Sequence, residues 1–513
     1  MQEILHLRLD NGRATKYNVA INRFSQPRSL KEASSVKAFG DKLRILSEEE
    51  ISRIDGASKE LLDLVGLTVY DKELLSILQQ QGCKVDFPGS TVRIDPTLLE
   101  SALEEAPEVV LLCGRDPQHD LLLNGERFHT RIMGGAPNIV DAHTRDQRTA
   151  KISDLAPCAR LVDGLESIDA SSMFPVSPTV PLLDVYDART CFCNTSKFLH
   201  YVCHNRDLID YVIDIASIVA GGAAALKKRP LLSGLVESLS PLAFEQDNAA
   251  VLKKFAVSGL PLAVHAHPIA GVSSPVTLAD ELVVLNAEVI GLIAIAELYR
   301  PGTSAIYGIS ASVPDMKTGL NLAGAIENAL LGCAGAQMAR YYGLPSTMSA
   351  GSDSKMVDAQ AAIERVTTLA LPAAAGIDLV NMTSANGKLA FSPAQLVVDN
   401  EVVRVLRRFE RGIDFDDSLI VTDMFLEGGR STSFLKHKHT VQNFREQLLD
   451  SALFSRESWQ EWVQSGRESL EDRAWERATC IIEQHDPIEL EDSKKADIDE
   501  LVASVEKERG ISG

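Results

Sequence analysis

Short strand-like runs alternate with apolar helical stretches over most of the chain, and this alternation constrains the fold more than any other feature. Seven runs rich in β-branched or small residues are expected to be strands: Ile168–Phe174, Phe198–Cys203, Pro230–Val236, Pro261–His265, Ser304–Ile309, Pro345–Ala350 and Ile377–Met382. Helices are expected between them, including Asp207–Val219, Ala243–Phe255, Leu278–Tyr299, Ala323–Tyr342 and Val357–Ala375. Regular β/α alternation predicts a parallel sheet with crossover helices.

The parallel sheet is expected to close into a (β/α)8 TIM barrel. An eighth strand is available from residues 126–145 or from Ser418–Thr422, although 126–145 also resembles a hairpin that turns at Gly134-Gly135. The alternative is a doubly wound nucleotide-binding sheet, which places a glycine-rich phosphate loop after its first strand. No such loop is present at that position, so the α/β barrel is favoured.

The barrel is expected to carry additions at both ends. Residues 1–44 form a basic arm, with eight Lys or Arg against two acids over 13–44. Residues 45–125 are expected to be a mainly helical region that begins at a capping box, with Ser47 as N-cap and Glu50 at its third helical position. The barrel itself is assigned to 126–426, and a charged helical tail to 427–513.

Charge and hydropathy exclude several classes of protein. A formal net charge of −20 and an isoelectric point near 5.1 argue against a nucleic-acid binder, whose footprint is basic. The first residues lack a basic start followed by a long apolar core, so no secretory signal is expected and a cytoplasmic location is predicted. The most apolar stretch, Leu278 to Leu298, contains four acids that are costly in lipid, which favours a buried helix.

Eight cysteines are spread thinly along the chain, a pattern typical of reduced thiols rather than of a disulfide framework. Cys191, Cys193, Cys203 and His204 offer zinc-ligand chemistry, but their spacing lacks the paired C-x-x-C knuckles of structural zinc sites. Structural or incidental thiols are therefore favoured over a metal site.

Candidate site residues follow from the rule that active-site groups of a TIM barrel lie at the carboxyl ends of the strands. The substrate-binding candidates at those ends are Phe174, His204, Glu237, His267, Tyr307, Ser310, Gly351, Ser352 and Asp353. No catalytic acid, base or nucleophile and no metal ligand is assigned.

Several candidates have an alternative explanation that requires no ligand. Glu237 is suited to orient a ligand, but a surface ion pair explains it equally. Tyr307 offers an aromatic face for a cation, or it packs in the core. The rings of His265 and His267 are expected to point to opposite faces of a strand, so one of them, not both, is a candidate for the barrel mouth, and a core histidine with its hydrogen bonds satisfied is an equal alternative. The small residues around Gly351 let a backbone approach a ligand closely, although turn geometry also explains them.

Several of these segments resemble the trimethylamine methyltransferase family in order and spacing. They are Leu46-Ser47-Glu48-Glu49-Glu50-Ile51, Met133-Gly134-Gly135-Ala136-Pro137, Pro275-Val276-Thr277-Leu278-Ala279, Tyr341-Tyr342-Gly343-Leu344-Pro345, Ala350-Gly351-Ser352-Asp353-Ser354-Lys355 and Asp358-Ala359-Gln360. The resemblance covers about residues 44–490.

The resemblance implies a barrel enzyme that passes a methyl group from a methylated amine to the cobalt of a separate corrinoid protein. Archaeal members carry a pyrrolysine, whose place here falls around Gly351 or Ser352, and this chain contains no such residue. Members without pyrrolysine act on quaternary amines such as glycine betaine, and this chain is similar to those. The corrinoid is expected on the partner, since no D-x-H-x-x-G pattern is present.

A quaternary amine suits a site without an acid, because its leaving group is already a neutral amine. The protein then has to hold the N-methyl group in line with cobalt and to accommodate a cation. Tyr307, Phe174 and Glu237 are the candidates for the cation. His267, Ser310 and the backbone of 352–354 are the candidates for a betaine carboxylate.

Other functions remain open at this stage. The same fold could act on another methylated amine or a sulfonium compound, or serve as a non-catalytic homologue that binds a corrinoid protein. A zinc-dependent hydrolase would require ligands from Glu237, His265, His267 and the cysteine cluster. The basic arm and the charged tail are suited to subunit contacts, so a homo-oligomer is predicted.

Overall fold

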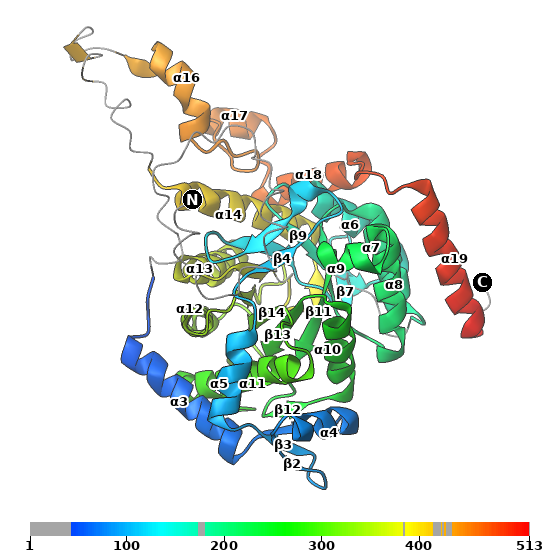
Figure 1. Ribbon diagram of the computed structural model, residues 1–513. Coiled ribbons are helices and arrows are strands. Elements are labelled where there is room, and N and C mark those ends of the chain that lie inside the picture. The colour runs from blue at the N-terminus through cyan, green and yellow to red at the C-terminus, as the bar shows by residue number, and fades with distance from the viewer. Residues whose placement is uncertain are drawn as a thin grey trace. The chain divides into compact units, whose positions relative to one another are not determined.

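Eight parallel strands close into a barrel in the computed structural model, which describes residues 43–172, 180–382, 385–413 and 433–511 together with Thr422, Phe425 and Leu426. The strands follow one another around the barrel in chain order, and β9, β11, β13 and β14 are labelled in Figure 1. They are β6 (His129–Ile132), β9 (Ala170–Ser172), β10 (Phe198–Tyr201), β11 (Leu232–Glu237), β13 (Leu262–Ala266), β14 (Ala305–Ile309), β15 (Ser346–Ala350) and β16 (Leu379–Met382). This confirms the predicted (β/α)8 barrel. The strand missing from the seven predicted runs is β6, which comes from the segment 126–145.

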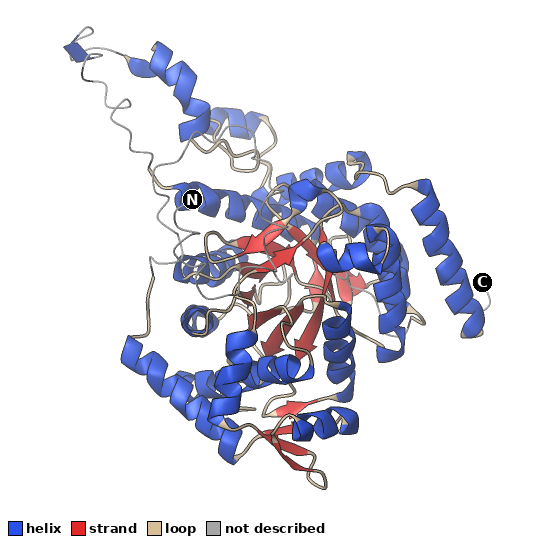
Figure 2. Cartoon of the chain, viewed as in Figure 1, coloured by secondary structure: helices blue, strands red, loops and turns tan. Residues whose placement is uncertain are grey.

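A helix follows each barrel strand and covers the outside of the sheet (Figure 2). These helices are α6 (Leu155–Gly164), α7 (Leu183–Asn194), α8 (Ile209–Ala220), α10 (Gln246–Ser258), α11 (Leu278–Tyr299), α12 (Ile326–Tyr341), α13 (Ala359–Ala375) and α14 (Pro393–Arg411). Three of them end at a glycine in the left-handed conformation, Gly221, Gly259 or Gly376, which turns the chain back towards the next strand.

The end of the barrel at which the strands begin is filled by a two-stranded hairpin. Strands β4 (Val110–Leu112) and β5 (Leu121–Leu123) pair antiparallel. Their apolar side chains form one buried cluster with residues from four barrel strands, Ala170, Phe198, Ile306 and Leu379. Because these four residues face inward near the strand starts, the hairpin forms an apolar floor.

The region before the barrel builds a small sheet and three helices. Helix α3 (Glu48–Leu64) begins at the predicted capping box, with Ser47 and Glu50 bonded reciprocally. Helices α4 (Lys72–Gln80) and α5 (Pro96–Glu105) follow within the region that is expected to be mainly helical. Strands β1 (Leu67–Val69), β2 (Lys84–Asp86) and β3 (Thr91–Arg93) form a sheet whose fourth member, β12 (Ala243–Phe244), comes from the loop after β11. The small sheet therefore holds a loop of the barrel.

Helix α11 is long and apolar enough to span a membrane, yet it is a core element here. It packs between the barrel strands β13 and β14 on one side and α3 and α5 on the other. In its most apolar window, 83% of the residues are buried within the protein. The acids Glu281, Glu288 and Glu297 of this helix are buried as well. The expected buried helix is thus confirmed.

The predicted hairpin at 126–145 is wrong in its position. Residues 129–132 belong to the barrel as β6, and the hairpin lies farther along, between β7 (Asn138–Val140) and β8 (Gln147–Thr149). Its turn is closed by hydrogen bonds between Asp141 and Arg145 or Asp146, not at Gly134-Gly135. Asp141 caps the turn by accepting from the backbone N–H groups of His143 and Thr144, a signal that outweighs the glycine pair.

The chain after α14 is helical where it is described, as expected of the tail. Its helices are α16 (Lys438–Gln447), α17 (Trp459–Gln464), α18 (Leu470–Gln484) and α19 (Asp492–Glu508). Helix α18 packs against α6 and α14, and α19 packs against α7 and α8. The domain limits at 44, 125 and 426 stay predictions, and residues 1–42 of the arm lie outside the described residues.

Candidate functional site

Two glycines show which side chains of the barrel strands face its interior. A Cβ atom on Gly234 of β11 would stand 2.7 Å from Val251 of the outer helix α10, so residues 233, 235 and 237 face inward. A Cβ atom on Gly308 of β14 would stand 2.5 Å from the ring of His265, so His265 extends across the inner face of β14. Since alternate residues of a strand share a face, His267 lies on the same side as His265.

A basic cluster occupies the interior above the apolar floor. It consists of Arg131 of β6, His200 of β10 and His265 of β13, all buried. Strands β6 and β13 are opposite each other in the barrel order, yet the charge of Arg131 lowers the pKa of both His200 and His265. The guanidinium therefore reaches into the centre of the barrel.

Each histidine of this basic cluster is held by a serine on a neighbouring strand or strand end. His200 Nδ1 lies 2.8 Å from Ser233 Oγ, and His265 Nδ1 lies 2.9 Å from Ser310 Oγ. The Nε2 atoms of both rings are buried and make no hydrogen bond with a described residue. Burial lowers the pKa of His265 to about 3 and that of His200 well below its usual range, so both imidazoles are neutral.

Polar groups also line the barrel mouth above the basic cluster. His267 Nε2 lies 3.1 Å from Ser312 Oγ and 3.2 Å from Asn321 Nδ2, which belong to the loop after β14. Burial, and secondarily the charge of Lys388, lowers the pKa of His267 to about 3. Leu235, Ser310 and His267 are only partly buried although they belong to barrel strands or their ends, so solvent reaches this level.

Glu237 and Lys388 bring opposite charges to the mouth. Glu237 is the last residue of β11, and its pKa is raised by burial and lowered by the charge of Lys388. Lys388 belongs to the loop after β16 and has a left-handed backbone, with φ of 78°. Burial lowers the pKa of Lys388, while the charges of Glu237 and Asp353 raise it. The two side chains are close enough to interact but form no ion pair within 4.0 Å in the described part of the chain.

A buried carboxylate of α11 fixes the loop that follows Glu237. Glu288 accepts hydrogen bonds from the hydroxyls of Ser238 and Ser240 and from the backbone N–H of Leu242, the last at 2.8 Å. Burial raises the pKa of Glu288, and these three donors oppose that rise. The mouth position of Glu237 is therefore set by helix packing as well as by its strand.

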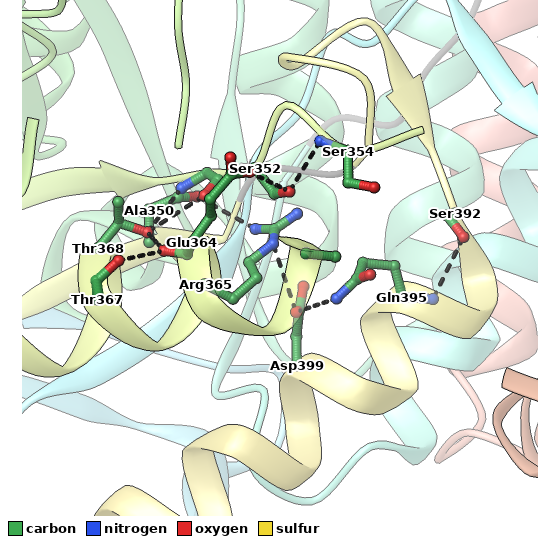
Figure 3. A network of polar contacts seen from close by, with 12 residues as sticks. Ala350, Ser352, Ser354, Glu364, Arg365, Thr367, Thr368, Ser392, Gln395 and Asp399 are labelled. Carbon is green, nitrogen blue, oxygen red and sulfur yellow. Dashed lines mark hydrogen bonds and ion pairs between the residues drawn. The ribbon is translucent and has the colours of Figure 1, made fainter. Parts of the chain in front are cut away.

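The loop after β15 is bound tightly to α13 (Figure 3). Ser352 Oγ and the backbone N–H of Asp353 both donate to Glu364, each at 2.8 Å, and the backbone N–H of Gly351 donates to Thr368 Oγ1 at 3.2 Å. The Asp353 carboxylate accepts the backbone N–H groups of residues 323 and 324, each at 2.9 Å. Gly351 and Ser352 thus fix the loop, and Asp353 joins it to the loop before α12.

The structure brings some of the predicted residues together and separates others. Glu237, His267, Ser310 and Asp353 gather at the mouth, whereas His204 lies beside α7, its Nδ1 4.0 Å from Asp184. Tyr307 faces outward, because its hydroxyl donates to Asn286 of α11 at 2.9 Å, so its predicted place in the mouth is wrong. Phe174 lies outside the described residues.

The expectation that the rings of His265 and His267 point to opposite faces of the strand is wrong, although one of them, His267, does line the mouth. The two rings share the inner face, and each is close enough to Lys388 for its charge to lower the pKa of the imidazole. Residues two apart on a strand point the same way, which makes both available to one site.

Arg131, His200 and Lys388 are site residues that strand-end reasoning misses. Arg131 and His200 stand inside short buried strands, and an ionisable residue in a buried strand is itself a signal. Lys388 stands in a turn of three consecutive residues with positive φ, Asn386, Gly387 and Lys388. Of these, Gly387 is a recognisable turn residue, but nothing in the local sequence predicts that the lysine turns inward.

The cysteine cluster does not meet at one point. Cys191 is buried in α7, where its thiol donates to Asp187 at 3.0 Å, and Cys203 follows β10. Burial raises the pKa of Cys203 to about 12. Among the residues that the structure describes, no three His, Cys, Asp or Glu side chains are arranged to hold a metal ion.

Comparison with known proteins assigns the family. The family model "Trimethylamine methyltransferase" matches residues 12–510. The chain is 31% identical to a trimethylamine methyltransferase of Desulfitobacterium hafniense, over 94% of this chain and 98% of the relative. It is also 31% identical to one of Methanosarcina thermophila, over 87% and 94%.

The chain is also similar to a glycine betaine methyltransferase and to a solved methyltransferase structure. A glycine betaine methyltransferase of Desulfitobacterium hafniense is 28% identical, over 91% of this chain and 98% of the relative. Among solved structures, the monomethylamine methyltransferase of Methanosarcina barkeri aligns over 86% of this chain and 94% of its own, with 12% identity and a TM-score of 0.46. By its match to the family model and its 31% identity to full-length members, this chain belongs to the trimethylamine methyltransferase family.

Proposed function

We propose that this protein transfers a methyl group from a small quaternary amine, glycine betaine or a close analogue, to the cobalt of a separate corrinoid protein. The observation that carries the proposal is the carboxylate of Glu237, which stands at the mouth of a polar lumen in a member of this family. A carboxylate attracts a quaternary ammonium, whose methyl groups donate no conventional hydrogen bonds. The similarity to a glycine betaine methyltransferase supports the choice of substrate.

The chemistry demands positioning rather than acid catalysis. The partner's reduced cobalt would supply the nucleophile that accepts the methyl group. The departing nitrogen keeps the bonding electron pair and leaves as a neutral tertiary amine, so no residue has to protonate it. The neutral His265 and His267 are compatible with such a site, because neither has to exchange a proton with the substrate.

The rim of the mouth supports docking of a carrier protein. Loops after three neighbouring strands expose large apolar side chains: Val272 and Val276 after β13, Met316 and Leu320 after β14, and Met356 after β15. Exposed apolar groups concentrated in this way are typical of surfaces that bind another macromolecule. They lie along one side of the end of the barrel at which the methyl group would be transferred.

The direct test is methyl transfer to cobalamin. Purified full-length protein is mixed with glycine betaine and chemically reduced free cobalamin, and formation of methylcobalamin is followed by its absorbance. Trimethylamine, choline and dimethylsulfoniopropionate are run in parallel. Methylcobalamin formed from glycine betaine, with dimethylglycine as the second product, supports the proposal.

The other outcomes of this assay would support a different substrate or a non-catalytic role. Transfer from another donor alone moves the substrate to that methylated amine or sulfonium compound. No transfer from any donor, combined with retained binding of a corrinoid protein, supports a non-catalytic homologue. The predicted homo-oligomer and cytoplasmic location need separate measurements, by light scattering of the purified protein and by cell fractionation.

A further inference from the structure

Arg131 is a buried cation that lacks a counter-charge within the described structure. Its side chain is 3% exposed, its Nη1 donates to the carbonyl of the adjacent Ile132 at 3.3 Å, and its Nε has no hydrogen-bond partner. Burial lowers the pKa of Arg131 to about 9, so the guanidinium is still charged at neutral pH. An unpaired charge in a protein interior is costly, which calls for an anion from elsewhere.

A second buried arginine shows how groups of the protein itself can pair with a guanidinium in this fold. Arg365 of α13 is 2% exposed, lies 3.6 Å from Asp399 of α14 and donates to the carbonyl of Ala350 at 3.2 Å (Figure 3). It lies in the helical layer, where no ligand has access. Arg131 differs from it in both respects, because it faces the lumen and has no carboxylate beside it.

The two histidines beside Arg131 offer further donors. If Ser233 and Ser310 donate their hydroxyl protons to the Nδ1 atoms, the neutral rings of His200 and His265 carry their own proton on Nε2. Both Nε2 atoms are buried and without a hydrogen-bond partner among the described residues. The two Nε2–H groups and the guanidinium would then form a set of donors with no acceptor.

We propose that Arg131, His200 and His265 form an anion subsite that binds the carboxylate of the methyl donor. This inference rests on the proposed function and narrows its substrate class to zwitterions, compounds with both a quaternary ammonium and a carboxylate. A guanidinium binds a carboxylate with two parallel hydrogen bonds, and such charge-assisted bonds are strong.

The positions of the charges also orient the substrate. Arg131 and His200 lie within β6 and β10, whereas Glu237 is the last residue of β11. The cation at the mouth, Lys388, already has the carboxylates of Glu237 and Asp353 near it, and their charges raise its pKa. Arg131 has no such counter-charge among the described residues. The carboxylate therefore enters first and lies deeper, and the ammonium group stays near Glu237. This orientation presents the N-methyl groups to the mouth, where the carrier has to approach.

Calorimetric titration of the full-length protein tests the subsite with three probes. Glycine betaine carries both charges, choline carries the cation alone, and tert-butylacetate carries the carboxylate on a neutral carbon skeleton of the same shape. We expect glycine betaine to bind at least about tenfold more tightly than choline, and tert-butylacetate to compete with it. In Arg131→Gln the preference over choline disappears, while Arg131→Lys retains part of it.

The matched control is Arg365→Gln, which removes a buried guanidinium outside the lumen. It is expected to lower the melting temperature and to keep the preference for glycine betaine. If Arg131→Gln fails to fold, two other measurements test the subsite. His200→Asn is expected to weaken the preference for glycine betaine over choline, and tert-butylacetate is expected to compete with glycine betaine on the wild-type protein. Equal binding of choline and glycine betaine, or an unchanged preference in folded Arg131→Gln, overturns the subsite.

Failure of the subsite and failure of the proposed function give different results. Methyl transfer to cobalamin from choline or trimethylamine as readily as from glycine betaine refutes the subsite and leaves a methyltransferase. Arg131-dependent binding of tert-butylacetate without transfer from any donor retains the subsite and refutes the methyltransferase.

Discussion

Gly308 of β14 lies directly against the imidazole of His265 on the neighbouring strand β13. A Cβ atom at Gly308 would stand 2.5 Å from the Cγ and Cδ2 atoms of that ring, and equally close to the carbonyl oxygen of Val264 on the same strand as His265, closer than non-bonded atoms approach. The missing side chain at Gly308 is thus what allows His265 to extend across the lumen and reach Ser310. A glycine on one strand determines where a polar group of the next strand lies.

Gly308→Ala is therefore expected to displace the His265 ring and to weaken glycine betaine binding by roughly tenfold or more. Calorimetric titration measures the affinity. Gly234→Ala is the matched control, since its Cβ would press on Val251 in the outer layer instead. Both variants should lose stability, but a loss of affinity in Gly234→Ala equal to that in Gly308→Ala would contradict this role of Gly308.

Glu237→Gln is expected to weaken the binding of glycine betaine by about tenfold, because the favourable interaction with the quaternary ammonium is lost. The affinity for tert-butylacetate, which has no positive charge, should not fall. Titration of both compounds separates the charge effect from a change in shape. Glu245→Gln, an exposed acid next to α10, is the control and should leave both affinities unchanged.

Met316→Asp is expected to raise the KM for the corrinoid protein several-fold and to leave the binding of glycine betaine unaltered, because Met316 is 82% exposed on the rim. Steady-state assays with varied carrier measure this effect. Val257→Asp places the same charge on an exposed site at the end of α10, far from the mouth along the barrel axis. An equal effect of both substitutions would argue against docking at the rim.

Glu297→Gln is expected to stabilise the protein in mild alkali. Burial raises the pKa of Glu297 to about 7 from an ordinary value of 4.5. The folded state therefore holds a proton that the unfolded state has lost, and the stability that this provides decreases as the pH rises through 7.

Urea unfolding at about pH 5 and about pH 8 measures the difference, which is expected to be on the order of 1–3 kcal/mol at the higher pH and close to zero at the lower. Glu60→Gln, on the exposed face of α3, is the control, and it should have the same small effect on the free energy of unfolding at both pH values. A gain for Glu297→Gln that is the same at both values would show that ionisation is not its cause.

Much of the fold is readable from the sequence because the barrel strands and their helices have short, well-separated patterns. The run at 304–309 becomes β14 and the Ser47 capping box starts α3, since both depend on local preferences. The hairpin was harder to place, because the carboxylate of Asp141 closes its turn while Gly134-Gly135 offered a more familiar signal.

The candidate site is less readable, because its residues come from several strands and loops. Tyr307 stands near a strand end, but only the alternation fixed by Gly308 shows that it faces outward. Arg131 sits in the middle of a strand of the opposite wall, and its proximity to His265 exists only once the barrel is closed. Asn386-Gly387 indicates a turn, but nothing in the local sequence shows that the side chain of Lys388 faces inward.

The apolar floor made by β4 and β5 has a kinetic meaning for such an enzyme. In the described structure the apolar side chains of β4 and β5 close the end of the barrel at which the strands begin, so a small molecule has to enter and leave through the mouth, where we propose that the carrier docks. Under the proposed function, substrate then has to be in place before the carrier arrives, and the demethylated amine stays enclosed until the carrier departs. The order in which substrate and carrier bind would then be set by the closed end of the barrel rather than by any residue at its mouth.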